Sequence, residues 1–296
     1  MIVYILVLSI VFFFCIFIVC PYTYDVIKHK PHVVNCKFPS SHFNFVHYVK
    51  HENFIPKRIY RTFITSDMTR SSFNSFPEPL KNTEKYAPEF EEIFFDGPRV
   101  QTFLETYYNP QIVRCFHLIR NDYLSAKNDF FKFLLIYQLG GVYLDLKSSV
   151  ASTRFNTIIQ HANNNLLVSS RKIGYFFRPF ISAIEGGERD LYHLAAPKGH
   201  PVLKHAINTL VYNIEQEYSK ATFFGGYGVL CLTGPYFYAR VLQNAKYKNV
   251  KVLKGDLNAT VLKFLDSKYK KRYSKNKGSD YWNFHTSVVK SDASFF

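Results

Sequence analysis

Acidic residues are scarce in this sequence. Asp and Glu total 22 against 37 Lys and Arg, which gives a formal net charge of +15 at pH 7. A surface this basic attracts polyanions such as nucleic acid, anionic lipid or sugar diphosphates, without selecting among them. The zinc-finger spacings, RNA-binding signatures and Arg-rich arms that accompany nucleic-acid binding are missing, so the sequence argues against a nucleic-acid partner.

Cysteine is also rare, and its distribution excludes a disulfide framework. Of five Cys residues, two lie in an apolar run at the N-terminus, and Cys36, Cys115 and Cys231 remain. Three thiols permit at most one intramolecular disulfide. The patterns Gly-x-Ser-x-Gly, His-Glu-x-x-His, Cys-x-x-Cys and the P-loop do not occur, so several common enzyme classes lack support.

Charged side chains are lacking in the first 20 residues. Residues 2–20 are apolar except for Ser9 and the Tyr4 hydroxyl, and such a run can span a ~30 Å hydrocarbon core. No basic segment precedes it and no Ala-x-Ala cleavage pattern follows it, so we predict an uncleaved transmembrane anchor over residues 1–20 rather than a signal peptide. Lys28 and Lys30 would favour a cytoplasmic main domain, whereas a single glycosylation sequon at Asn258 leaves a lumenal one open.

The remaining chain divides into a stem and one large domain. Residues 21–52 contain three prolines and no sustained period, which indicates a stem or linker, and residues 53–296 form the predicted domain. Within it we expect a buried strand over 54–63, a loop over 66–82, a helix over 99–108 and a less certain element over 111–119.

A helix over residues 126–139 is the clearest element. Phe130, Phe133, Leu134 and Tyr137 recur with helical spacing, and Ser125 or Asn128 could cap the start. Gly140 then ends the helix, and a short buried strand over 142–146 follows. This order is typical of an α/β domain, and it places an acid, Asp145, at the carboxyl edge of a sheet, where α/β proteins bind ligands.

Further elements extend the same pattern. We expect a strand over 166–168, a helix over 201–218, a flexible Gly-rich turn over 225–228 and a helix over 236–243 that begins after Pro235. The predicted fold is α/β and Rossmann-like, with a mixed, mainly parallel sheet flanked by helices and preceded by the transmembrane helix.

Four stretches share a pattern in the same order along the chain. They are residues 55–60 (Ile-Pro-Lys-Arg-Ile-Tyr), the run from Asn128 through Gly140-Gly141-Val142-Tyr143-Leu144-Asp145, residues 195–201 (Ala-Ala-Pro-Lys-Gly-His-Pro) and Thr233-Gly234-Pro235. Together they resemble glycosyltransferase family 32, and the resemblance covers about residues 54–245. The resemblance implies a GT-A fold and hexose transfer from a nucleotide sugar to a glycan or lipid acceptor, with retention of configuration. Within this family, the chain is similar in particular to the yeast initiating and sphingolipid mannosyltransferases, so mannose is the favoured sugar.

The resemblance also implies roles for individual residues. Asp129 matches an acid that binds the donor ribose or sugar, Lys132 replaces an Arg that contacts the sugar, and Asp145 matches the first acid of the Asp-x-Asp motif. The resemblance implies that further residues bind the donor: Tyr60, Gly140, Gly141, Thr233, Gly234, Trp282 and His285. For Tyr60, packing in the core is the alternative.

The second acid of the motif is missing, because the sequence reads Asp145-Leu146-Lys147. Hard carboxylate oxygens suit Mn²⁺ or Mg²⁺, but the ammonium of Lys147 would repel a cation, so metal binding by Asp145 is doubtful. Three readings stay open: Lys147 replaces the metal as a catalytic residue beside Asp145, the domain is an inactive nucleotide-sugar-binding or glycan-binding pseudoenzyme, or Asp145 retains a metal with ligands from elsewhere. We expect a single-pass membrane protein with its domain in the Golgi or ER lumen, a cytoplasmic orientation remaining open.

Overall fold

The computed structural model describes residues 44–65, 73, 77–171, 188–220, 223–245, 250–253, 261–264 and 286–290. The predicted anchor over 1–20 lies outside these residues. Among the helices within them, none is long and apolar enough to cross a membrane.

A mixed sheet organises the fold, and seven of the described strands belong to it. These strands are β1 (Arg58–Phe63), β2 (Glu91–Asp96), β3 (Gly141–Leu144), β5 (Leu166–Arg171), β6 (Glu188–Arg189), β7 (His193–Ala196) and β8 (Val250–Leu253). Their order is β2-β1-β3-β7-β5-β6, and β8 pairs with β5. Strands β1, β2 and β3 are parallel, β7 is antiparallel to both β3 and β5, β6 is antiparallel to β5, and β8 is parallel to β5. Five strands therefore point one way and two the other, which confirms the predicted mixed, mainly parallel sheet.

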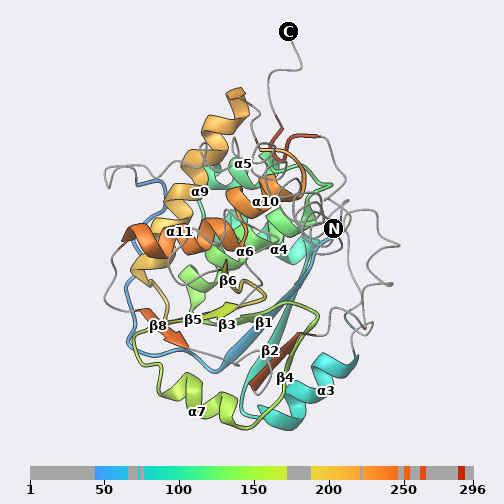
Figure 1. The fold of residues 1–296 in the computed structure, drawn as a ribbon, viewed down its shortest axis with the longest axis vertical. Helices are drawn as coiled ribbons and strands as arrows, with labels where there is room; N and C mark the ends of the chain where they lie inside the picture. Colours follow the sequence, from blue (N-terminus) through green and yellow to red (C-terminus); the bar gives the residue numbers. More distant parts are fainter. Residues whose placement is uncertain are drawn as a thin grey trace, which may run out of the picture.

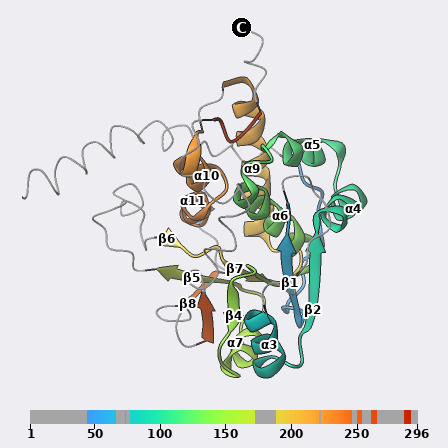
Figure 2. The ribbon, with the colours of Figure 1, turned by 90° about the vertical axis from the view of Figure 1, so that its right-hand side faces the viewer.

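Helices cover both faces of this sheet (Figures 1 and 2). On one face lie α4 (Gly97–Tyr107), α5 (Pro110–Leu118), α6 (Leu124–Leu139), α9 (Pro201–Lys220), α10 (Gly225–Leu232) and α11 (Pro235–Ala245), and on the other lie α3 (Pro77–Tyr86) and α7 (Arg154–Gln160). A second, two-stranded sheet of β4 (Ser148–Val150) and β9 (Leu262–Phe264) lies with α3 and α7. The larger apolar core fills the space under the first set of helices, with α6 at its centre.

Local sequence signals explain where α4 and α5 begin. The Asp96 carboxylate accepts a hydrogen bond from the Arg99 N–H at 3.1 Å, and the Asn109 side chain accepts one from the Ile112 N–H at 3.0 Å. A proline follows each cap within the first turn, where its missing N–H costs nothing. Each such cap contributes about 1 kcal/mol to helix stability.

The predicted elements agree with the structure at β1, α4, α5, α6, β3, β5, α9 and α11, and differ in three places. Residues 77–86 form α3, so the loop expected over 66–82 is wrong in its last six residues. Helix α6 begins at Leu124 with Tyr123 as N-cap and no side-chain cap, so the expected caps at Ser125 and Asn128 are wrong. The Gly-rich stretch 225–228 is the first turn of α10, because tertiary packing buries the apolar residues that follow it.

The end of the predicted stem packs on the domain. Val46 and Val49 are buried, and their backbone N–H groups bond the Asn208 side chain of α9 at 3.0 Å and the Tyr137 hydroxyl of α6 at 3.2 Å. Residues 44–52, the end of the predicted stem, therefore pack against α6 and α9.

Candidate active site

An ionic cluster lies where the carboxyl end of β3 meets α6. Lys132 extends its ammonium to Asp129 Oδ1 at 2.9 Å, one helical turn earlier, and to Asp145 Oδ1 at 3.3 Å, immediately after β3. The same ammonium donates to the carbonyl of Leu191 at 2.6 Å, just before β7. The predicted acid is thus at the carboxyl edge of the sheet, and the predicted donor residues of α6 reach it.

The charges in this cluster perturb one another strongly. Burial alone would lower the pKa of Lys132, but Asp129 and Asp145 together outweigh burial and raise it above its ordinary value. Burial raises the pKa of Asp129 to about 6, against the opposing effect of Lys132. Two carboxyl groups thus share one ammonium, which stays protonated at neutral pH.

Asp145 begins a tight turn that connects β3 to β4. The Ser148 N–H donates to the Asp145 carbonyl at 2.8 Å, which closes the turn across Leu146 and Lys147. The Asp145 N–H in turn donates to the Tyr192 carbonyl at 2.8 Å. Asp145 and Lys147 are therefore placed by a turn and not by an extended strand.

Thr233, a predicted donor-binding residue far along the chain from Asp129 and Asp145, also lies beside the ionic cluster. It is fully buried at the end of α10, and a hydrogen bond from its side chain is among the influences that lower the pKa of Asp129. Gly234 follows in a tight helix-to-helix connection, where an added Cβ would lie 2.9 Å from the Leu230 Cα. The Thr-Gly-Pro stretch thus places a hydroxyl beside Asp129, and the glycine is needed for the close approach.

A polar network that the sequence did not reveal supports the cluster from β1. The Thr62 hydroxyl bonds the Tyr143 hydroxyl at 2.5 Å and the Asn128 side-chain oxygen at 2.8 Å. The Tyr143 ring lies under the Lys132 ammonium, 4.9 Å from the ring centroid, where a cation–π attraction adds to the ion pairs. Burial raises the pKa of Tyr143, so its hydroxyl stays neutral. The only sequence signal was the alternation of residues in β3, which puts Tyr143 on the α6 side.

A second unforeseen group lies at the neighbouring strand ends, where β5 finishes and β7 begins. Ser169 is 3.0 Å from Asp190 Oδ2 and 3.1 Å from His193 Nε2. Burial, followed by the charge of Lys132, lowers the pKa of His193 to about 4, so the imidazole is neutral at physiological pH. Because the acid contacts the serine and not the histidine, the three residues do not have the order of a nucleophilic triad.

Three predicted donor-binding residues lie away from the cluster. Gly140 and Gly141 have φ angles of +67° and +101° at the amino end of β3, and Gly141 is four residues, about 13 Å of extended chain, from Asp145. Added Cβ atoms there would meet the Lys198 backbone at 2.7 Å and the Tyr60 ring at 2.9 Å. Tyr60 itself is fully buried against Phe95. The two glycines therefore build the turn at the amino end of β3, and Tyr60 is part of the apolar core.

The remaining predictions are not tested by the geometry. Trp282 and His285 lie outside the described residues. Within the described part of the chain, no group of three His, Cys, Asp or Glu side chains is arranged to hold a metal ion. Asp145, the expected metal ligand, has the Lys132 ammonium at one of its oxygens instead.

Comparisons with known proteins give distant similarities only. No protein-family model and no curated protein matches the sequence. Among solved structures, the chain is similar to "PaToxG Glycosyltransferase", with 13% identity, a TM-score of 0.45 and coverage of 75% of this chain and 76% of that one. It is also similar to the UDP-bound glycosyltransferase domain from the YGT toxin, with 10% identity, a TM-score of 0.44 and coverage of 68% and 80%. At this level of likeness, function has to be inferred from the residues of the chain itself.

Proposed function

We propose that this chain is a GT-A-type glycosyltransferase that transfers a hexose from a nucleotide sugar to a glycan or lipid acceptor. The observation that carries the proposal is the meeting of Asp129, Lys132, Asp145 and Thr233 at the carboxyl edge of the sheet. Two stretches that lie about 90 residues apart in the sequence contribute these residues, and both were singled out by the same family resemblance. A chance resemblance would have no reason to bring them together.

The two carboxylates are suited to holding the sugar. Asp129 and Asp145 offer acceptor oxygens to hydroxyl groups, and Lys132 and Thr233 fix Asp129 from two sides. The Lys132 ammonium limits the negative charge at this point, so that a neutral sugar ring meets a nearly balanced site. We assign the cluster to binding and orienting the donor.

The residues around Asp145 do not fit a divalent cation. Lys132 already contacts Asp145 Oδ1 at 3.3 Å, and the turn after Asp145 supplies Lys147 where a second carboxylate would be needed. A metal placed there would face two ammonium groups, which repel it. We therefore propose that transfer proceeds without a metal ion. The Lys147 ammonium would stabilise the negative charge that develops on the diphosphate leaving group.

The finer features of the proposal follow from the family resemblance. They are mannose from GDP-mannose as the favoured donor, with UDP-galactose and UDP-glucose next, retention of configuration, and attachment to a membrane through residues 1–20. The acceptor would be a glycan or a lipid.

The second candidate is a pseudoenzyme that binds a nucleotide sugar or a glycan without turnover. It is favoured by the lost second acid, because Lys147 replaces the residue on which the resembling enzymes rely. Donor binding by Asp129, Lys132 and Asp145 would be common to both candidates.

Donor hydrolysis by the full-length protein in detergent separates the two. Wild type, Lys147→Ala and the control Lys57→Ala would be measured with each of the three donors, with and without EDTA; Lys57 is exposed at the opposite end of the sheet. We expect EDTA-resistant hydrolysis that is lost in Lys147→Ala and kept in Lys57→Ala. Loss of activity on adding EDTA would refute the assignment of Lys147, and saturable donor binding without hydrolysis would favour the pseudoenzyme.

A further inference from the structure

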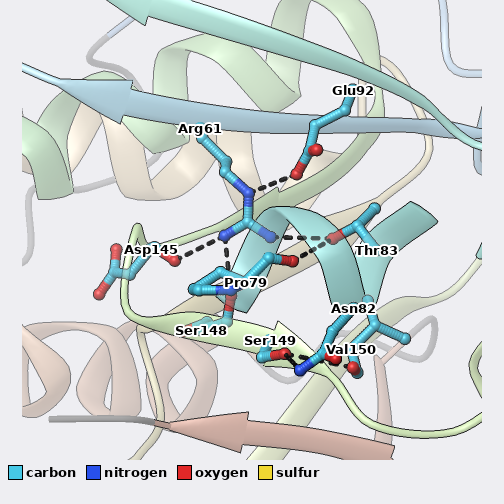
Figure 3. Close-up of polar contacts among 9 residues, drawn as sticks. All are labelled: Arg61, Pro79, Asn82, Thr83, Glu92, Asp145, Ser148, Ser149 and Val150. Atoms are coloured by element: carbon cyan, nitrogen blue, oxygen red, sulfur yellow. Dashed lines mark hydrogen bonds and ion pairs between the residues drawn. The ribbon is translucent and has the colours of Figure 1, made fainter. Parts of the chain in front are cut away.

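Arg61 holds the turn that carries Asp145 and Lys147. It lies on β1 with its side chain fully buried, and its Nη1 donates to the Asp145 carbonyl at 2.9 Å and to the Ser148 carbonyl at 2.8 Å. These are the first and last residues of the turn (Figure 3). One nitrogen therefore fixes both ends of a four-residue segment.

Side chains of β2 and α3 hold the Arg61 guanidinium in place. Its Nε donates to Glu92 Oε1 on β2, and its Nη2 donates to the Thr83 hydroxyl on α3 at 3.1 Å. That hydroxyl in turn donates to the Pro79 carbonyl at 3.0 Å, so it is free to accept from Arg61 (Figure 3). The planar fork of an arginine can serve a carboxylate, a hydroxyl and two carbonyls at once, which a lysine cannot do.

The opposite side of the turn is held by the backbone before β7. The Tyr192 carbonyl accepts from the Asp145 N–H at 2.8 Å and from the Ser148 hydroxyl at 3.2 Å. Arg61 and Tyr192 thus both hydrogen-bond Asp145 and Ser148, and they do so from the two sides of β3. Without Arg61 the turn would lose one of its two supports, and the Ser148 carbonyl would lose its side-chain donor.

We propose that Arg61 is a positioning residue that sets the direction of Asp145 and Lys147 through their backbone. The proposal rests on the proposed function for its effect on transfer, because it supposes that these two side chains meet the donor. A displacement of about 1 Å in such groups can cost up to about 100-fold in rate. Arg61 itself does not touch the donor.

A neighbouring ion pair supplies a matched control. Arg58, three residues before Arg61, joins the same two strands through Glu91, with Arg58 Nε 3.2 Å from Glu91 Oε2. Their side chains are 49% and 64% exposed, whereas Arg61 is 0% and Glu92 18% exposed. Arg58→Lys thus repeats the substitution Arg61→Lys on the same strand without affecting the turn.

The test compares wild type, Arg61→Lys, Arg58→Lys and Glu92→Gln as full-length proteins in detergent. Donor hydrolysis gives kcat and KM, and hydrogen exchange read by mass spectrometry follows peptides that cover residues 141–150. We expect Arg61→Lys to lower kcat by about 10- to 100-fold, to raise KM by a smaller factor because the displaced Asp145 also holds the donor, and to speed exchange around Ser148. Glu92→Gln should give the same changes to a smaller extent, and Arg58→Lys neither.

The two readouts separate the failure of this proposal from the failure of the proposed function. Wild-type kcat and unchanged exchange in Arg61→Lys would overturn the positioning role. If wild type hydrolyses none of the donors, the proposed function fails, and faster exchange in Arg61→Lys but not in Arg58→Lys would still support the hold on the turn. If Arg61→Lys does not fold, Glu92→Gln decides by the same measurements, and wild-type behaviour in that variant overturns the proposal.

Discussion

Helix α6 carries two buried lysines five residues apart, and their surroundings differ sharply. Lys127 and Lys132 are each only 1% exposed. Lys132 contacts two carboxylates and a carbonyl oxygen, whereas Lys127 has no hydrogen-bond partner within the described chain and lies over the Phe116 ring, 4.7 Å from its centroid. The pKa of Lys132 is raised, and burial followed by the charge of Lys290 lowers that of Lys127 to about 8.

The difference shows what makes a buried ammonium tolerable. Burial penalises the charged form of both lysines, and only nearby carboxylates offset the penalty at Lys132. The charged group that acts on Lys127 is another cation, Lys290. Burial and then the charges of Lys127 and Lys290 lower the pKa of the nearby His117, against the opposing effect of Glu105. Lys132 is therefore an ion-paired member of a charged site, whereas the uncompensated charge of Lys127 lowers the stability of the fold at neutral pH.

Removing the better-partnered lysine should have the largest effect. Lys132→Met leaves Asp129 and Asp145 close together without a cation, and we expect the free energy of unfolding to fall by about 3–5 kcal/mol. Urea denaturation measures the loss. The double variant Lys132→Met/Asp129→Asn should recover part of it because one of the two neighbouring carboxylates is gone, and a double variant no more stable than the single one would contradict this account.

Removing the other lysine should have the opposite sign. Lys127→Met eliminates a buried ammonium that has no counter-ion among the described residues, so we expect a gain of about 2 kcal/mol at pH 7. The folded-state pKa of about 8 lies below the ordinary 10.5, so the unfolded chain binds more protons between these values. Wild-type stability should therefore rise over pH 8–10.5, and the advantage of Lys127→Met should shrink there.

Urea denaturation at pH 7, 9 and 10.5 measures this trend. The exposed control Lys81→Met should stay within about 0.5 kcal/mol of wild type at every pH. A destabilised Lys127→Met at pH 7 would show that the cation–π contact with Phe116 outweighs the burial penalty.

Lowering the pH should remove one of the two carboxylate partners of Lys132 and so make its surroundings more like those of Lys127. The pKa of Asp129 is raised to about 6 from its ordinary 3.8, so this carboxyl takes up a proton in the folded state as the pH falls through 6. Its contribution to stability is thus present below about pH 4 and lost as the pH rises through 6. Donor binding should run the other way and weaken several-fold from pH 7 to pH 5, because the Asp129 anion is lost.

Isothermal titration with GDP-mannose, UDP-glucose and UDP-galactose over pH 5–8 tests this dependence. Asp129→Asn should bind weakly at every pH and lose the step near pH 6. A step that persists in Asp129→Asn would assign the titration to another group.

The smallest expected effect concerns the charge that faces Lys127. Lys290 is exposed, and its repulsion adds to burial in lowering the pKa of Lys127. Lys290→Gln should raise the pKa of Lys127 by a few tenths of a unit, because an exposed charge is largely screened by water. NMR titration of the Lys127 side chain measures the change, with Lys81→Gln as the control that should leave it in place.

The sequence by itself determined the elements whose signals are local. The helical spacing of Phe130, Phe133 and Tyr137 gives α6, and Gly140 ends it because that position needs a positive φ. The strand that follows delivers Asp145 to the carboxyl edge, and the period of α6 puts Asp129 one turn before Lys132. These features depend on neighbours within a few residues, which a pattern can express.

Tertiary structure alone decided which groups surround those residues. The partners of the Asp145 turn, Arg61 and Tyr192, come from strands on either side of β3, and nothing in the sequence specifies the order β1-β3-β7. Packing also made a helix of the Gly-rich stretch 225–228 and, within the part of the chain that the structure describes, left Lys127 without a counter-ion. The physical reason is that burial and ion pairing depend on distances across the fold, whereas periodicity and capping depend only on distances along the chain.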